Sequence, residues 1–70
     1  MHYAIVIEKA SSNYAAYVPD LPGCVATGAT IQETEGMIRE AIEFHLEGLR
    51  TDSLPIPPPG SQVKHIEVPA

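Results

Sequence analysis

The sequence predicts a small two-layer α+β domain in which one amphipathic helix covers one face of an antiparallel-rich sheet. The first observation is that four short segments have the composition or the alternating polarity of strands. The second is that residues 31–50 repeat apolar side chains with the helical period of 3.6. The third is the length of 70 residues, which suits one domain and no more. The expected order is β-β-β-α-β, in one domain covering residues 1–70.

The first half of the chain predicts a hairpin and a third strand. The expected strands cover residues 2–9, 14–18 and 24–27. In the first of these, Tyr3, Ile5 and Ile7 share one face. The turn-forming cluster at 10–13 joins the first two strands as a hairpin. Two prolines and a glycine in residues 19–23 exclude both helix and regular ladder, so we expect a shaped loop there.

The helix has a clear start signal and one apolar side. Thr30 and Glu33 have the spacing of a capping box, with Thr30 as the N-cap and Glu33 at the third helical position. The positions that follow the helical period are Ile31, Glu35, Ile38, Ile42, His45, Leu46 and Leu49. Most charged residues fall on the opposite side, so the helix is expected to run over 31–50 and to pack on the sheet.

The last third of the chain predicts a stiff connector and a fourth strand. Four prolines in 55–59 favour polyproline II, because each ring fixes φ and removes a donor. Residues 62–68 then alternate in polarity as a strand does. We therefore expect the chain to return to the sheet after the connector.

Composition narrows the class of protein. Nine acidic residues against four basic ones give a formal charge of −5, which argues against direct nucleic-acid binding by this chain alone. An acidic surface suits a basic partner, although net charge also simply keeps a small protein soluble. One cysteine indicates a reducing compartment, and no segment has the length of a membrane span or the pattern of a signal peptide. These features predict a cytoplasmic protein.

Residues that could carry catalysis are present but scattered. His2, His45 and His65 lie in three different expected elements and lack metal-ligand spacing. The glutamates of the helix are typical of a solvated face rather than of convergent carboxylates around metal ions. Cys24 has no cationic neighbour in the sequence to activate it, so packing is its expected role. The sequence predicts no enzyme, no cofactor and no metal.

Three short motifs together resemble the HicB family of antitoxins. They are Tyr17-Val18-Pro19-Asp20-Leu21-Pro22-Gly23-Cys24, then Thr27-Gly28, and Glu40-Ala41-Ile42 in the helix. The resemblance implies a partial RNase H-like fold and a partner similar to HicA, a small basic mRNA endoribonuclease. It also implies inhibition by covering the toxin's active site. Many family members carry a C-terminal DNA-binding module, and residues 1–70 are expected to contain none.

The loop at 20–24 is the tentative partner-binding site, formed by Asp20, Leu21, Pro22, Gly23 and Cys24. Alternatively, Asp20 bonds local backbone donors and Pro22 and Gly23 only fix the shape of the turn. The leading hypothesis is an antitoxin-like inhibitor. The first alternative is an oligomeric HicB-like binding or regulatory module without a toxin partner, and the second is a nuclease or metalloenzyme. A homodimer or homotetramer is expected, through a strand edge or the open face of the sheet.

Overall fold

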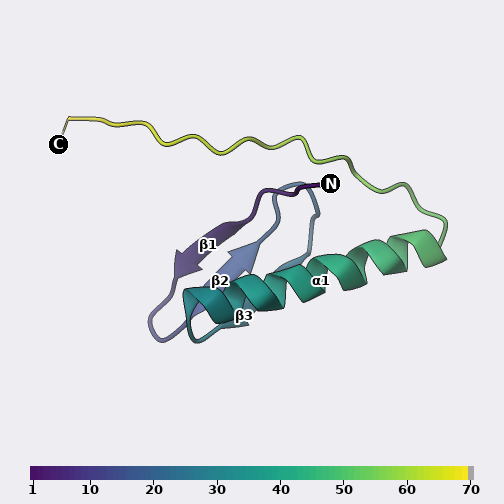
Figure 1. Ribbon diagram of the computed structural model, residues 1–70, viewed down its shortest axis with the longest axis horizontal. Helices are drawn as coiled ribbons and strands as arrows, with labels where there is room; N and C mark the ends of the chain where they lie inside the picture. Colours follow the sequence, from purple (N-terminus) through teal and green to yellow (C-terminus); the bar gives the residue numbers. More distant parts are fainter. Residues whose placement is uncertain (70) are drawn as a thin grey trace.

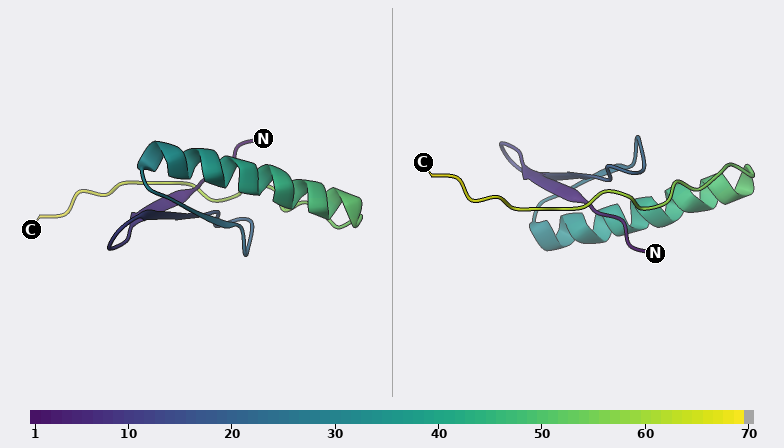
Figure 2. Two further views of the ribbon diagram at one scale, coloured as in Figure 1. Left: turned by 90° about the horizontal axis from the view of Figure 1, so that it is seen from below. Right: turned by 90° about the horizontal axis from the view of Figure 1, so that it is seen from above.

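The fold consists of a three-stranded antiparallel sheet followed by one long helix (Figure 1). The computed structural model describes residues 1–69. The elements are β1 (Val6–Lys9), β2 (Tyr14–Tyr17), β3 (Val25–Gly28) and α1 (Ile31–Thr51), and the strand order is β1-β2-β3. The predicted α+β class is therefore confirmed, with the helix on one face of the sheet (Figure 2).

The first strand is shorter than the prediction of 2–9 because its neighbour β2 is short. Val6 pairs with Tyr17, the last residue of β2, so residues before Val6 run past the end of that strand. Tyr3, Ile5 and Ile7 nevertheless pack against the core, as their shared face predicts. The ladder thus ends where the partner strand ends, although the apolar pattern continues.

The register of the sheet separates a buried face from an open one. Ile7, Ala16 and Ala26 lie in one cross-strand row, and Ala16 in its centre is buried against the core. The core is formed by Ala16, Val18, Leu21, Cys24, Ile38 and Leu46. The helix contacts mainly β3 and β2, so β1 lies at the edge of the covered area.

The N-terminus of α1 confirms the capping box and explains the glycine just before it. Thr30 Oγ1 accepts a hydrogen bond of 3.0 Å from the Glu33 amide, and the Glu33 carboxylate accepts one of 3.1 Å from the amide of Ala29. A Cβ at Gly28 would lie 2.6 Å from Thr34 Oγ1, which is closer than real Cβ atoms approach. Gly28 therefore allows the end of β3 to touch the first turn of the helix.

The C-terminus of α1 reverses the chain through a Schellman motif. The Leu54 amide donates to the Leu49 carbonyl at 2.8 Å, and the Ser53 amide donates to the Arg50 carbonyl at 3.1 Å. Ser53 is in the left-handed region with φ of 55°, and Pro55 follows two residues later. The helix ends at Thr51, within one residue of the prediction, and the proline-rich connector runs back along the molecule.

The structure corrects the prediction of a fourth strand at 62–68. These residues are extended and exposed, but they pair with no strand of the described chain, 1–69. We call residues 62–69 the C-terminal arm, and Figure 1 shows it running past the sheet into open space. The physical reason is that alternating polarity favours a strand only where an edge is offered, and the connector directs this segment away from its own sheet.

Candidate functional site

The loop between β2 and β3 is closed by three backbone hydrogen bonds. The Val18 amide donates to the Cys24 carbonyl at 3.2 Å, the Leu21 amide to Val18 at 3.1 Å, and the Cys24 amide to Leu21 at 3.1 Å. Gly23 has φ of +83°, which suits glycine because a side chain would be strained there. Two residues of the tentative site, Leu21 and Cys24, are buried in the core, while Pro22 and Gly23 are exposed at its tip.

Asp20 connects this loop to the other end of the chain. One carboxylate oxygen accepts hydrogen bonds from the Gly60 and Ser61 amides, both at 3.0 Å, and the other accepts from the Ser61 hydroxyl at 2.9 Å. These bonds to the charged form, led by that from the Ser61 amide, hold the pKa of Asp20 below its usual value of 3.8. The alternative in which Asp20 caps its own turn is wrong, since all three of these partners are distant in sequence.

A second contact supports the same connector from the N-terminal segment. The Tyr3 hydroxyl donates a hydrogen bond to the Pro57 carbonyl, and Ile56 packs against the core. Together with Asp20, these contacts fasten residues 56–61 to the body of the molecule. The arm begins immediately after this fastened stretch.

Cys24 is a packing residue, as the sequence predicts. Its side chain belongs to the core cluster, and burial raises the pKa of its thiol above the ordinary value of 9.0. A raised pKa disfavours the thiolate, which is the nucleophilic form. The loop therefore offers a shaped surface and no reactive group.

The described part of the chain holds neither a metal-ligand cluster nor a membrane-spanning helix. Within 1–69, no three histidine, cysteine or acidic side chains are grouped so that they could hold a metal ion. No helix in the same range combines the length and apolar character needed to cross a membrane.

The structure shows an apolar surface that the sequence pattern did not single out. We call Val25, Met37, Glu40 and Phe44 the Phe44 surface, where a shallow groove runs between β3 and the helix. Phe44 is 81% exposed and Met37 is 45% exposed. Their spacing of seven residues is a helical signal, but they lie beside the main apolar stripe and were not assigned to it. An exposed aromatic residue with apolar neighbours is the kind of feature that anchors protein interfaces.

The comparisons with known proteins identify the family. A model described as "HicB_like antitoxin of bacterial toxin-antitoxin system" matches residues 3–69. The chain belongs to this family. A UPF0150 protein of Helicobacter pylori is 47% identical over 49 residues, covering 70% of this chain and 68% of the relative. A UPF0150 protein of Synechocystis is 34% identical over 68 residues, covering 96% and 86% of the two chains.

One relative and one solved structure add to this HicB-like assignment. An uncharacterized 14.9 kDa protein of Haemophilus phage HP1 is 44% identical over 57 residues, which are 81% of this chain but only 43% of the phage protein. A chain in the solved "HicA3 and HicB3 toxin-antitoxin complex" is 33% identical, with a TM-score of 0.73. The likeness covers 84% of this chain and 70% of that chain.

Charged side chains follow the whole length of the HicB-like helix, and two of them line hollows that contain Phe44. Five glutamates and two arginines lie between residues 31 and 51, and all seven side chains are exposed. Glu40 lines the Phe44 groove, and Glu47 lines a second hollow that also includes Phe44. The surface therefore combines an aromatic centre with carboxylates at its rim, which is complementary to a basic partner with an apolar pocket.

Proposed function

We propose that this chain is an antitoxin that binds a small basic ribonuclease of the HicA type and inhibits it. The observation that carries the proposal is the likeness, over 84% of the chain, to a chain of a solved toxin–antitoxin complex. The family match over residues 3–69 supports the same role. On this proposal the chain acts by binding and performs no catalysis of its own.

The proposed mechanism is steric. A ribonuclease must expose a basic surface to its RNA, and an acidic protein competes for that surface through charge. Phe44 would supply the buried contact at the centre, and Glu40 and Glu47 the charge at the rim. Covering the toxin's active site in this way would keep the catalytic group from the phosphate.

The exposed tip of the β2–β3 loop is a second proposed contact. Pro22 and Gly23 project there, while Leu21 and Cys24 hold the loop from beneath and Asp20 fastens the C-terminal connector. In this division of roles, only Pro22 and Gly23 of the five tentative site residues reach a partner. The other three make the loop rigid enough to present them.

The remaining parts of the proposal concern assembly and location. We infer a homodimer or homotetramer, because so small a domain leaves a large fraction of its surface uncovered. The negative charge supports a chain that binds no nucleic acid by itself, and the single buried thiol suits the cytoplasm. An RNA-cleaving partner would act in that same compartment.

The first experiment recovers the partner. Tagged full-length protein is used to capture proteins from its own cell lysate at low and moderate salt, and the retained species are identified by mass and assayed for RNA cleavage. We expect a small basic ribonuclease that is inactive in the complex and active after release. Recovery of self-oligomers alone, from cells shown to express such a toxin, would instead favour the stand-alone binding module.

A matched pair of variants tests the surface. Phe44→Ala is expected to weaken toxin binding about 30-fold, the effect of losing an interface residue worth about 2 kcal/mol. Ile31→Ala is the control, because Ile31 is also an exposed apolar residue of α1 but lies at its first turn, away from the Phe44 surface. Affinities are measured by isothermal titration calorimetry. Equal affinities for the two variants would exclude the Phe44 surface as the toxin contact.

A further inference from the structure

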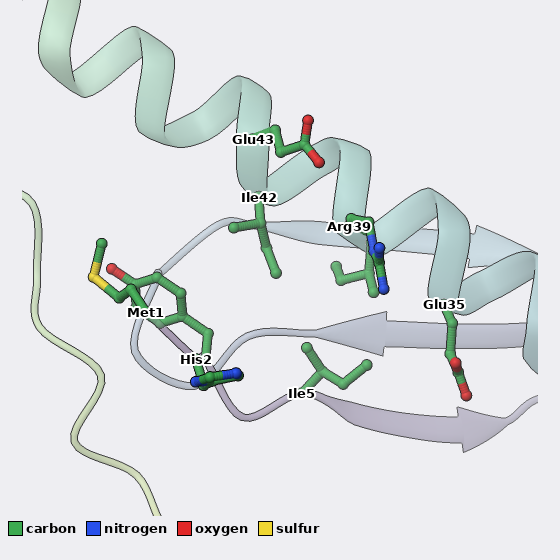
Figure 3. Close-up of a pocket in the computed structure, with 9 residues that line it drawn as sticks. Met1, His2, Ile5, Glu35, Arg39, Ile42 and Glu43 are labelled. Atoms are coloured by element: carbon green, nitrogen blue, oxygen red, sulfur yellow. The ribbon is translucent and has the colours of Figure 1, made fainter.

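Among the described residues, the sheet has two unpaired edges, β1 and β3, and the β1 edge lies beside an uncovered groove. β1 pairs with β2 on one side only, so its other edge presents free backbone groups of the kind that add a further strand. Beside this edge, the N-terminal segment and α1 enclose a groove of ≈ 310 Å³. Figure 3 shows Ile5 and Ile42 pointing into it from opposite sides. Ile38 lies in the same lining, so the groove has an apolar floor.

The helical side of this groove carries two carboxylates and one cation, while Met1 and His2 line it from the N-terminal segment. Glu35, Arg39 and Glu43 line it from the helix, as Figure 3 shows. A strand added at β1 would place every second side chain over the floor and below these side chains. The best occupant would therefore present apolar residues and one cation on a single face.

The C-terminal arm has that pattern. Strand alternation puts Lys64, Ile66 and Val68 on one face, and Val63, His65 and Glu67 on the other. Ile66 is 82% exposed and Val68 is 67% exposed, so both are available to a partner. Lys64 supplies one cation for the two carboxylates on the helical side of the groove.

The path of the connector indicates that the acceptor is a second copy of the chain. The prolines of 55–59 make the connector stiff, and Asp20 fixes Gly60 and Ser61 just before the arm begins. From this fixed point the arm leaves its own sheet and stays clear of β1 in Figure 1. Each chain thus offers the free β1 edge with its groove and one free arm, and two chains satisfy both features by reciprocal exchange about a two-fold axis.

We propose that the C-terminal arm of one copy adds to β1 of a second copy as a fourth strand, with Lys64, Ile66 and Val68 over the groove. The exchange would complete the β-β-β-α-β sheet between two chains. It goes beyond the antitoxin role and involves no toxin residue, so it is tested on the isolated full-length protein. It also commits the dimer to the β1 edge and leaves the Phe44 surface, beside β3, free for another partner.

The test compares two substitutions on opposite faces of the arm. Ile66→Asp should raise the dimer dissociation constant at least tenfold, roughly the cost of burying a charge in place of an apolar side chain. Val63→Asp makes the same kind of change on the outward face and should leave the constant within about threefold of the wild type. Sedimentation velocity measures both, with far-UV circular dichroism as the check that each variant is folded.

A second measurement shows which chain receives the arm. A one-to-one mixture of ¹³C,¹⁵N-labelled and unlabelled full-length protein is examined by isotope-filtered NMR. Intermolecular contacts between Ile66 or Val68 and Ile5 are expected. A dimer unaffected by Ile66→Asp, a monomer with a solvent-exchanging arm, or an arm that contacts only its own β1 would each overturn the proposal.

Discussion

The β2–β3 loop and the C-terminal arm differ in what determines their conformation, although Asp20 of the loop bonds Gly60 and Ser61 directly before the arm. The loop is closed by three internal hydrogen bonds and places Leu21 and Cys24 in the core. The arm, 62–69, is exposed along its whole length and extends beyond the body of the molecule. The loop is thus specified within one chain, whereas the arm has the sequence of a strand and obtains no partner from its own fold. The irregular β2–β3 loop is therefore held by more contacts within the chain than the arm, whose sequence is that of a strand.

The largest expected effect tests this contrast directly. Leu21→Ala should lower the free energy of unfolding by about 2–5 kcal/mol, because Leu21 is completely buried and truncation leaves a cavity. Val63→Ala in the arm should change it by less than about 0.5 kcal/mol. Urea unfolding at fixed protein concentration measures both. Similar losses for the two variants would mean that the Val63 side chain, which is 59% exposed in the structure, is packed in solution.

Two glycines allow the same comparison between a position in close contact, Gly28, and an open one, Gly36. Gly28→Ala should destabilise the fold by about 1–3 kcal/mol, since its Cβ would lie 2.8 Å from the Thr34 amide nitrogen as well as 2.6 Å from its hydroxyl. Gly36→Ala should stabilise it by up to about 1 kcal/mol, because nothing lies near a Cβ there and alanine favours the helix. Thermal unfolding would show opposite shifts in Tm. Shifts of the same sign would contradict the close approach of β3 to α1.

The smallest effect concerns the junction of the two regions. Asp20→Ala removes three hydrogen bonds to Gly60 and Ser61, so the amides of both residues should exchange faster with solvent while the core amides keep their protection. Hydrogen exchange followed by NMR measures this. Glu8→Gln removes an exposed carboxylate on β1 and serves as the control. Unchanged exchange at Ser61 in the alanine variant would exclude the proposed fastening.

The hydrogen bonds between Asp20 and residues Gly60 and Ser61 should weaken when the pH is lowered. The pKa of Asp20 is lower in the folded state than its ordinary value of 3.8. The stabilisation that the ionised carboxylate gives to the folded chain is therefore complete above 3.8 and is lost as the pH falls through the lower, folded pKa. The Ser61 amide resonance should therefore move only in strongly acidic solution. In Asp20→Ala that transition should disappear, and its persistence would assign it to another group.

Local signals in the sequence predicted most of the fold. The capping box of Thr30 and Glu33 fixed the helix start because its partners lie three residues apart. Asp20 could not be assigned in this way, since its partners lie 40 and 41 residues away and no local pattern links them. Helical periodicity does not indicate the role of Phe44, because it identifies the side that faces the core and gives no weight to a second, narrower apolar stripe.

The strand expected at 62–68 shows what a local sequence pattern cannot predict. Its alternation is a property of the segment alone, whereas pairing requires an edge in the right place. The connector and the Asp20 contacts decide where the segment goes, and both are tertiary features. Sequence reasoning therefore identified an extended segment at 62–68, but the strand that it predicted there is not formed within the described residues.

Ser53 sets the direction in which the chain leaves α1 and so the direction of the arm. One left-handed residue ends α1, turns the chain back and sets the direction in which the prolines then carry it. Because an α-helix turns about 100° per residue, one residue inserted into the last turn of α1 would rotate this departure by about the same angle. The body could remain folded, but Gly60 and Ser61 would no longer reach Asp20. The length of α1 therefore determines the direction of the connector and of the arm, although the arm lies many residues further along the chain.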